Sequence, residues 1–293
     1  MTIRPLLFAL SAAVLCMLQG CHAPIATEAD VDIRAKGTPL ATTDGAKCER
    51  LGKNRFHVSI PRVRSAAVKQ PPHTQWCWAA CTATVLNAKG QRTSPADVAS
   101  MFSGVNPNAV ASPLCVMLAL NPDLDKRYRE RLNKGGYTGS EQLGAMTATM
   151  GAEDTVTSDW LISQLSEGEP AVVGLHEAGA TQGHLCVIYG ATYSQAAANA
   201  RLTNWVATQS ISSSRGSPRV KYVLHSVDIV DPDPDVPMYS TLPASYVRDN
   251  VDLLLTRKLA RDELQDMIRN GTARNRTFKK TTTYQWHLEG GTR

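Results

Sequence analysis

The chain has 293 residues, 43% of them hydrophobic, and a formal net charge of +5. This composition is ordinary for a globular protein with a substantial core, and it excludes a chain that is disordered throughout. The positive charge is small and dispersed along the sequence, so no nucleic-acid partner is expected.

Residues 1–20 have the pattern of a signal peptide for export. Arg4 precedes an apolar run from Leu6 to Leu18, which is shorter than the ~20 residues that a permanent membrane span needs. The ending Leu18-Gln19-Gly20-Cys21 resembles the lipobox of bacterial lipoproteins, in which the cysteine carries lipid. This resemblance implies a lipid anchor at Cys21 in the cell envelope, facing the periplasm or the outer surface. A plain secretory signal with an incidental Cys21 is the alternative.

The next segment, residues 21–60, has no sustained periodicity until the alternating run Phe56–Ile60, which is typical of a strand. We expect most of this segment to be a tether or a propeptide-like segment. The start of the folded domain is accordingly predicted at residue 61.

The first part of the domain, residues 61–256, is predicted to be helical. One helix should run from Cys77 to Asn87, and Gly90 fits as its C-terminal stop. The pair Ser94-Pro95, an N-cap followed by proline, predicts a second helix that ends near residue 102. The Pro, Gly and Asn residues of 104–139 predict an irregular insertion outside the core.

Further helices are expected after Ser140 and after Ser158, and then the period of the pattern changes. Short β-rich runs separated by turn residues follow, at Ala171–Leu175, Leu185–Tyr189 and Ser226–Val230. Helices followed by strands indicate an α+β fold with an antiparallel sheet. Residues 257–293 are predicted to form a C-terminal helix, through Ile268, and a basic tail.

The cysteine count suggests disulfides and one free thiol. Two of the seven cysteines, Cys16 and Cys21, belong to the signal and the lipobox, and five remain: Cys48, Cys77, Cys81, Cys115 and Cys186. In an oxidising compartment an odd number favours pairs plus one free thiol. If Cys77 is the free thiol, the other four allow three pairings, of which we suggest the one with a Cys81–Cys115 bond.

Cys77 is the candidate nucleophile because it lies between Trp76 and Trp78 where a helix begins. The unpaired N–H groups and the dipole of a helix N-terminus favour a negative charge, so the thiolate forms more easily than at a free cysteine with a pKa of ~8.5. A buried structural cysteine, or a disulfide with Cys81 one helical turn later, is the alternative.

A thiolate nucleophile needs a base that also protonates the leaving group, which suits an imidazole. Among seven histidines, His184 is the best candidate because it opens a predicted strand. Asp231 ends another predicted strand and can hold the imidazole in one orientation. His176 and His225 are interpreted as structural histidines.

Four segments resemble the compact bacterial branch of papain-like cysteine peptidases, which includes bacteriocin leader peptidases and plant-pathogen effector proteases. They are Gln70, Cys77-Trp78-Ala79-Ala80, Gly183–Gly190 and Val230-Asp231-Pro232. The resemblance covers roughly residues 61–256. It implies an N-terminal helical half, with the nucleophile helix packed on a C-terminal antiparallel sheet.

By this resemblance Cys77 attacks, His184 is the general base and acid, Asp231 orients the ring, and Gln70 stabilises the oxyanion. Gln70 lies seven residues before Cys77, whereas the family glutamine lies about six before, and Gln75 is the other candidate. The expected activity is hydrolysis of a polypeptide substrate through a thioester, without a cofactor.

Two other functions use the same sequence features. A transglutaminase-like or amidase activity would pass the acyl group of the same thioester to another acceptor. A catalytically silent surface-binding module would need no reactive thiol. A zinc site from Cys77, Cys81, His184 and Cys186 is not favoured, because neither C-x-x-C nor H-x-x-x-H spacing occurs.

Overall fold

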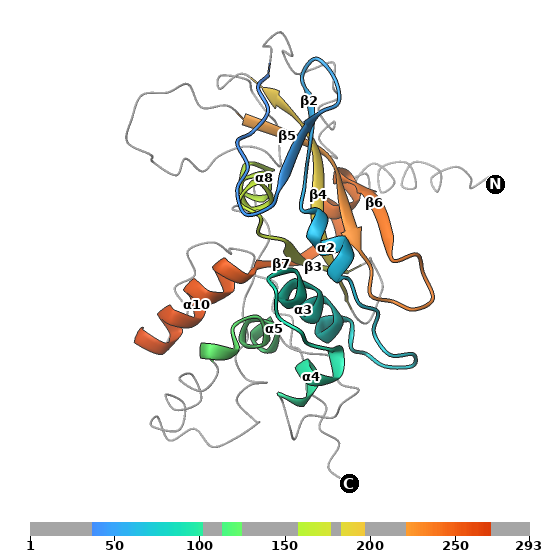
Figure 1. The fold of residues 1–293 in the computed structure, drawn as a ribbon, viewed down its shortest axis with the longest axis vertical. Coiled ribbons are helices and arrows are strands. Elements are labelled where there is room, and N and C mark those ends of the chain that lie inside the picture. Colours follow the sequence, from blue (N-terminus) through green and yellow to red (C-terminus); the bar gives the residue numbers. More distant parts are fainter. Residues whose placement is uncertain (1–36, 102–112, 125–157, 177–182, 197–220, 271–293) are drawn as a thin grey trace, which may run out of the picture.

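The computed structural model describes residues 37–101, 113–124, 158–176, 183–196 and 221–270 (Figure 1). The predicted signal peptide, Cys21, the helix predicted after Ser140 and the basic tail lie outside these described residues. Within the described part, no helix combines the length and the apolar character that crossing a membrane requires.

The described strands form one antiparallel sheet of seven strands. They are β1 (Lys47–Arg50), β2 (Arg55–Ser59), β3 (Ala171–Leu175), β4 (His184–Ala196), β5 (Lys221–Val230), β6 (Tyr239–Pro243) and β7 (Val251–Thr256). The long strand β4 is central. One of its edges pairs with β5, and the other pairs with β3 near the start of β4 and with β2 farther along. β1, β6 and β7 extend the sheet beyond β2, β5 and β3.

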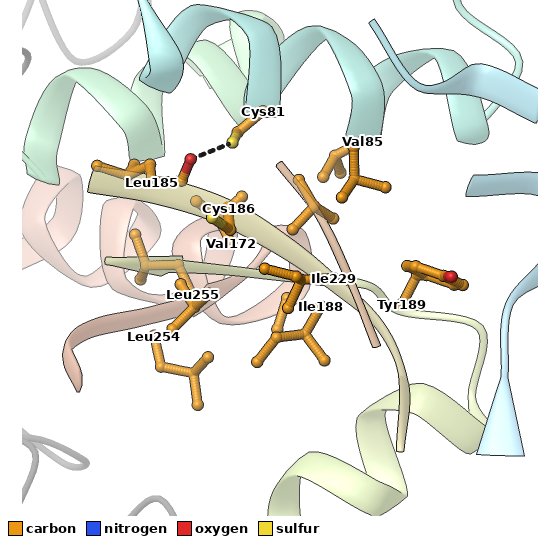
Figure 2. Close-up of a cluster of buried hydrophobic side chains, with 14 of the residues drawn as sticks. Cys81, Val85, Val172, Leu185, Cys186, Ile188, Tyr189, Ile229, Leu254 and Leu255 are labelled. Carbon is orange, nitrogen blue, oxygen red and sulfur yellow. Dashed lines mark hydrogen bonds between the residues drawn. The ribbon is translucent and has the colours of Figure 1, made fainter. Parts of the chain in front are cut away.

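Seven helices surround this sheet in the described part of the chain. They are α2 (Pro61–Ala66), α3 (Cys77–Ala88), α4 (Pro95–Ser100), α5 (Pro113–Leu120), α8 (Ser158–Ser166), α9 (Ala244–Asn250) and α10 (Arg257–Asn270). α3 and α8 lie on opposite sides of the sheet around β4 (Figure 2). α8 also contacts β3, and all five residues of β3 are buried.

Helix α3 is the centre of the helical part. It packs against α2, α4, α5 and β4, and all of its residues except Asn87 are buried. Ala79, Ala80 and Ala83 let these neighbours approach the helix axis closely. A helix that is buried on nearly every side is part of the core, so its sequence lacks the polar face of a surface helix.

The contact between α3 and β4 includes both apolar packing and a polar link. Figure 2 shows Cys81 and Val85 of α3 directed toward the sheet, beside Leu185 and Val172. The Cys81 thiol donates a hydrogen bond to the Leu185 carbonyl at 3.2 Å. The first turn of α3 is therefore held next to the start of β4.

The predicted α+β class is confirmed, and the structure refines the elements within it. The helices predicted at Cys77, after Ser94 and after Ser158 are present, as are the three predicted strands and the C-terminal helix. Within the described residues, however, β1 and β2 precede the first helix. β2 confirms the strand predicted at Phe56–Ile60, whereas β1, which pairs with it, lies in the part of residues 21–60 that was predicted to be a tether or propeptide-like segment.

The prediction of an irregular insertion over residues 104–139 is wrong for its described part. Residues 113–120 form α5, and the side chains from Cys115 to Leu120 are buried. Pro113 is compatible with the start of a helix, and the apolar run that follows fills the space between α3 and α10. The Pro, Gly and Asn residues on either side of this short helix led to the prediction of an irregular segment.

The suggested Cys81–Cys115 disulfide is also absent. None of the five described cysteines, Cys48, Cys77, Cys81, Cys115 and Cys186, is in a disulfide. Cys81 is directed toward β4, where its thiol contacts Leu185, and Cys115 is on α5. The sequence spacing carried no information on these directions.

A partly buried hydrogen bond links β2 and β5 across the central strand β4. His57 Nε2 on β2 donates to Asp228 Oδ2 on β5 at 2.7 Å, above β4, which lies between them. Gly190 of β4 makes this possible, because a Cβ there would lie 2.7 Å from the Asp228 oxygen and 3.2 Å from His57 Nε2. The hydrogen bond from His57 lowers the pKa of Asp228, against the opposing effect of burial.

This pair predicts a pH-dependent stability. Because folding lowers the pKa of Asp228 below its unfolded value of about 3.9, the carboxylate stabilises the fold above about pH 4. That contribution is lost as the pH falls through the folded pKa. Asp228→Asn should reduce the free energy of unfolding by about 1 kcal/mol at neutral pH, and by less below about pH 4, in urea denaturation. Asp235→Asn, at an exposed turn, is the control, and an equal loss at every pH would contradict the assignment.

Candidate active site

The candidate nucleophile is placed by the start of α3. Cys77 is the first residue of that helix, and 9% of it is exposed. The N-cap residue Trp76 makes no side-chain hydrogen bond to the first turn. The first N–H groups of α3 therefore have no hydrogen bond from a capping side chain. The positive end of the helix dipole lies at Cys77.

The candidate base and its carboxylate are placed by two neighbouring strands. His184 begins β4 and Asp231 follows the last residue of β5. β4 and β5 are antiparallel, and Val187 pairs with Val230. The start of β4 and the end of β5 therefore lie next to each other. His184 Nε2 donates to Asp231 Oδ1 at 2.8 Å. The side chain of His184 is 37% exposed and that of Asp231 is 17% exposed, so the ring is the part that solvent can reach.

Hydrogen bonds set the charges of this pair. Burial opposes a positive ring, yet hydrogen bonds with Asp231, Cys186 and Cys77 outweigh it and raise the pKa of His184. Burial likewise opposes a negative Asp231, but the bonds from His184 and from the Asp233 N–H lower its pKa overall. The ring is thus hydrogen-bonded to a carboxylate, and the Cys77 thiol is among the neighbours that favour its protonated form. A cationic imidazole is the kind of neighbour that stabilises a thiolate.

A second thiol lies at the same ring. Cys186 is two residues after His184 in β4, and side chains two apart in a strand point to the same face. Burial raises the pKa of Cys186, and the hydrogen bond from His184 partly offsets this effect. From the sequence, Cys186 was one of four cysteines expected to form disulfides. The i, i+2 spacing from His184 was the signal that could have placed it beside the base.

Gln70 is close to the candidate base along the backbone, and its side chain is directed at the loop before α3. Its backbone N–H donates to the Pro232 carbonyl at 2.9 Å, next to Asp231. Its side-chain Nε2 donates to the Thr74 carbonyl at 3.0 Å, which occupies one of the two amide hydrogens. Gln75, the other candidate for the oxyanion donor, is exposed.

Lys69 holds the turn that carries Asp231. Its Nζ donates to the Asp233 carbonyl and, at 2.6 Å, to the Val236 carbonyl. Asp231 N–H also donates to the Met238 carbonyl at 2.8 Å, which closes the turn at its base. The lysine charge is among the causes that lower the pKa of Asp231. Sequence reasoning did not find Lys69, because its partners are backbone carbonyls that are distant in the sequence.

The chain was compared with protein families, with curated proteins and with solved structures. No family model, no curated protein and no solved structure matches it. The chemistry of the site therefore has to be derived from the residues that the structure brings together: Cys77, His184, Asp231 and Cys186, with Gln70 and Lys69 at the Asp231 turn.

Removal of the lysine cation should loosen the Asp231 turn. Lys69→Met leaves two carbonyl groups without their charged donor, so we expect the free energy of unfolding to fall by about 1–2 kcal/mol in urea denaturation. Limited proteolysis should also cut faster between Asp231 and Met238. Lys53→Met, at an exposed lysine of the β1–β2 turn, is the control. Unchanged stability and cleavage in Lys69→Met would show that the turn does not depend on this side chain.

Proposed function

We propose that this chain is a papain-like cysteine peptidase with Cys77 as the nucleophile. The observation that carries the proposal is that His184, hydrogen-bonded to Asp231, is also near enough to the Cys77 thiol for that thiol to contribute to the raised pKa of the ring. The three residues come from a helix start, a strand start and a strand end that are far apart in the sequence. A thiol, an imidazole and a carboxylate in series are the parts that nucleophilic catalysis of acyl transfer needs.

The fold supports this proposal in its arrangement. The helix that begins with Cys77 packs against β4, the strand that begins with His184, and β4 belongs to an antiparallel sheet. This is the arrangement that the resemblance of the four sequence segments to papain-like peptidases implies. The two strands before the helices add to the sheet without approaching the Cys77 end of β4, because β2 pairs with Gly190 to Ser194.

The reaction follows from the roles of these groups. The Cys77 thiolate attacks the carbonyl carbon of a peptide bond, and the imidazolium of His184 gives its proton to the leaving amine as the C–N bond breaks. The product is a thioester between Cys77 and the acyl part of the substrate. His184 then takes a proton from water, whose oxygen attacks the thioester, and the carboxylic acid and the thiol are released. Asp231 keeps Nε2 protonated, so that Nδ1 is the nitrogen that exchanges the proton with sulfur and substrate.

The oxyanion of each tetrahedral intermediate needs hydrogen-bond donors. The backbone N–H of Cys77, at the uncapped start of α3, is one donor. The second is the Gln70 side chain, which keeps one amide hydrogen beyond its bond to Thr74. Loss of one such donor typically raises the barrier by about 3 kcal/mol.

The proposed substrate is a polypeptide that the protein meets outside the cytoplasm. The support for this location is the signal and lipobox pattern that ends at Cys21. A lipid at Cys21 would hold the domain at the membrane surface of the cell envelope.

Replacement of the nucleophile tests the proposal directly. Cys77→Ala should abolish peptide cleavage while the fold survives, because Cys77 contributes only a small buried side chain to the core. The measurement is cleavage of a peptide library by the purified chain, with products identified by mass spectrometry in the presence and absence of an added amine. Cys48→Ser is the matched control, since its hydroxyl can keep the bond to Tyr193. Cleavage by Cys77→Ala at the wild-type rate would end the proposal.

The orienting role of Asp231 gives a graded expectation. Asp231→Ala removes the acceptor of the His184 Nε2–H and should lower kcat/KM by about 100-fold. Asp231→Asn should lose less, because a carboxamide oxygen can still accept the same hydrogen bond. Steady-state kinetics on the best library peptide measures both variants. Equal losses in the two would indicate that the negative charge, and not the orientation of the ring, is what matters.

A further inference from the structure

The proposed reaction does not use Cys186, although this thiol lies within the same cluster. The donor atoms of His184, Cys186 and Asp231 all lie within 4.8 Å of one another. Cys186 is 1% exposed, and the Cys77 thiol contacts the same ring. A thiol, an imidazole and a carboxylate this close together are a set of ligands as well as a set of catalytic groups.

We propose that His184, Cys186 and Asp231 form a zinc site, whose fourth position is left for water. Zinc prefers nitrogen and sulfur donors, and a carboxylate oxygen is a common third type of ligand. The soft thiolate disfavours Ca²⁺ and Mg²⁺, which select sites made only of oxygen ligands. The site differs from the four-residue set considered from the sequence, because Asp231 takes part and Cys81 instead donates to the Leu185 carbonyl.

The distances fit a tetrahedral ion after small side-chain movements. With bonds of about 2.0–2.3 Å, ligand atoms of a tetrahedral zinc ion lie about 3.6 Å apart. The three donor atoms are at most 4.8 Å apart, so each has to move by roughly 1 Å or less. The backbone that carries them is well supported, because Cys186 pairs with Val173 in the register of β3 and β4.

Zinc at this site and peptide hydrolysis exclude each other. Zinc occupies the imidazole and the carboxylate that the proposed reaction uses, so the ring can no longer exchange a proton with the Cys77 sulfur and the substrate. Binding displaces the proton of the Cys186 thiol, which leaves to solvent. The exposed side of the His184 ring is the route by which an ion can enter. Zinc therefore acts as a reversible inhibitor of the site, and Cys186 is the residue that adds this property to it.

The test measures metal binding in a chain that has no catalytic thiol, so its result does not depend on the proposed peptidase activity. The full chain with Cys77→Ala, purified metal-free and reduced, is titrated with Zn²⁺ in competition with a chromogenic chelator. We expect one zinc ion per chain. Adding Cys186→Ser should weaken the affinity at least about tenfold, whereas adding Cys48→Ser should leave it unchanged. Equal affinities with and without Cys186, or no stoichiometric binding, would overturn the proposal.

Cobalt provides a second readout that reports the ligand itself. Co²⁺ bound in the Cys77→Ala chain should show a thiolate-to-cobalt charge-transfer band. The band should disappear with Cys186→Ser and persist with Cys81→Ser. If circular dichroism shows that Cys186→Ser is unfolded, His184→Ala decides the question, because its side chain is partly exposed and its loss leaves the core intact. A band that persists in His184→Ala would refute the site.

Competition in the wild-type chain tests the inhibitory consequence. Zinc should slow alkylation of Cys77 by iodoacetamide, and a chelator should restore the rate. The same protection should be at least about tenfold weaker in Cys186→Ser at equal zinc concentration. Protection that is identical in wild type and Cys186→Ser would show that Cys77 and His184 bind zinc without Cys186, which contradicts the proposed ligand set.

Discussion

The packing of α3 against the start of β4 is the constraint on which the candidate site depends. Nearly every residue of α3 is buried, so the helix has no freedom to rotate or slide without disturbing α2, α4, α5 and β4 at once. The bond from the Cys81 thiol to the Leu185 carbonyl links the two elements one turn beyond Cys77 and one residue beyond His184. The packing of the core therefore fixes the position of the Cys77 sulfur relative to the His184 ring.

Strand β4 carries out two tasks along its length. Near its start, β4 pairs with β3 and carries His184 and Cys186 on one face. Farther along, it pairs with β2, and the hydrogen bond between His57 and Asp228 crosses it at Gly190. Its pairing with β5 delivers Asp231 to the His184 end. The bonds from Lys69 and from the Gln70 backbone then attach the turn after β5 to the segment that leads into α3. The turn that carries Asp231 is thus held by the β4–β5 pairing and by the segment that precedes α3.

The same donor atoms allow two chemistries at one place. A thiolate beside an imidazole is a nucleophile when the ring can exchange a proton, and it is a metal ligand when an ion takes the lone pairs. In the two proposals, the second thiol, Cys186, decides which chemistry prevails, because two ligands hold a soft ion weakly and three or four hold it well. The residue two positions after the proposed base would then connect the proposed catalysis with the proposed inhibition by zinc.

Local patterns in the sequence were sufficient for the elements that carry the proposed nucleophile, base and carboxylate. A helix start at Cys77, a strand start at His184 and a strand end at Asp231 each follow from periodicity and punctuation within about ten residues. The tertiary structure alone decided the rest: β1 joined the sheet beside β2, α5 joined the core, Cys81 and Cys115 formed no disulfide, and Cys186 lay at the ring. The physical reason is that burial and side-chain contact are created by segments distant in the chain, whereas periodicity records only the neighbours along it.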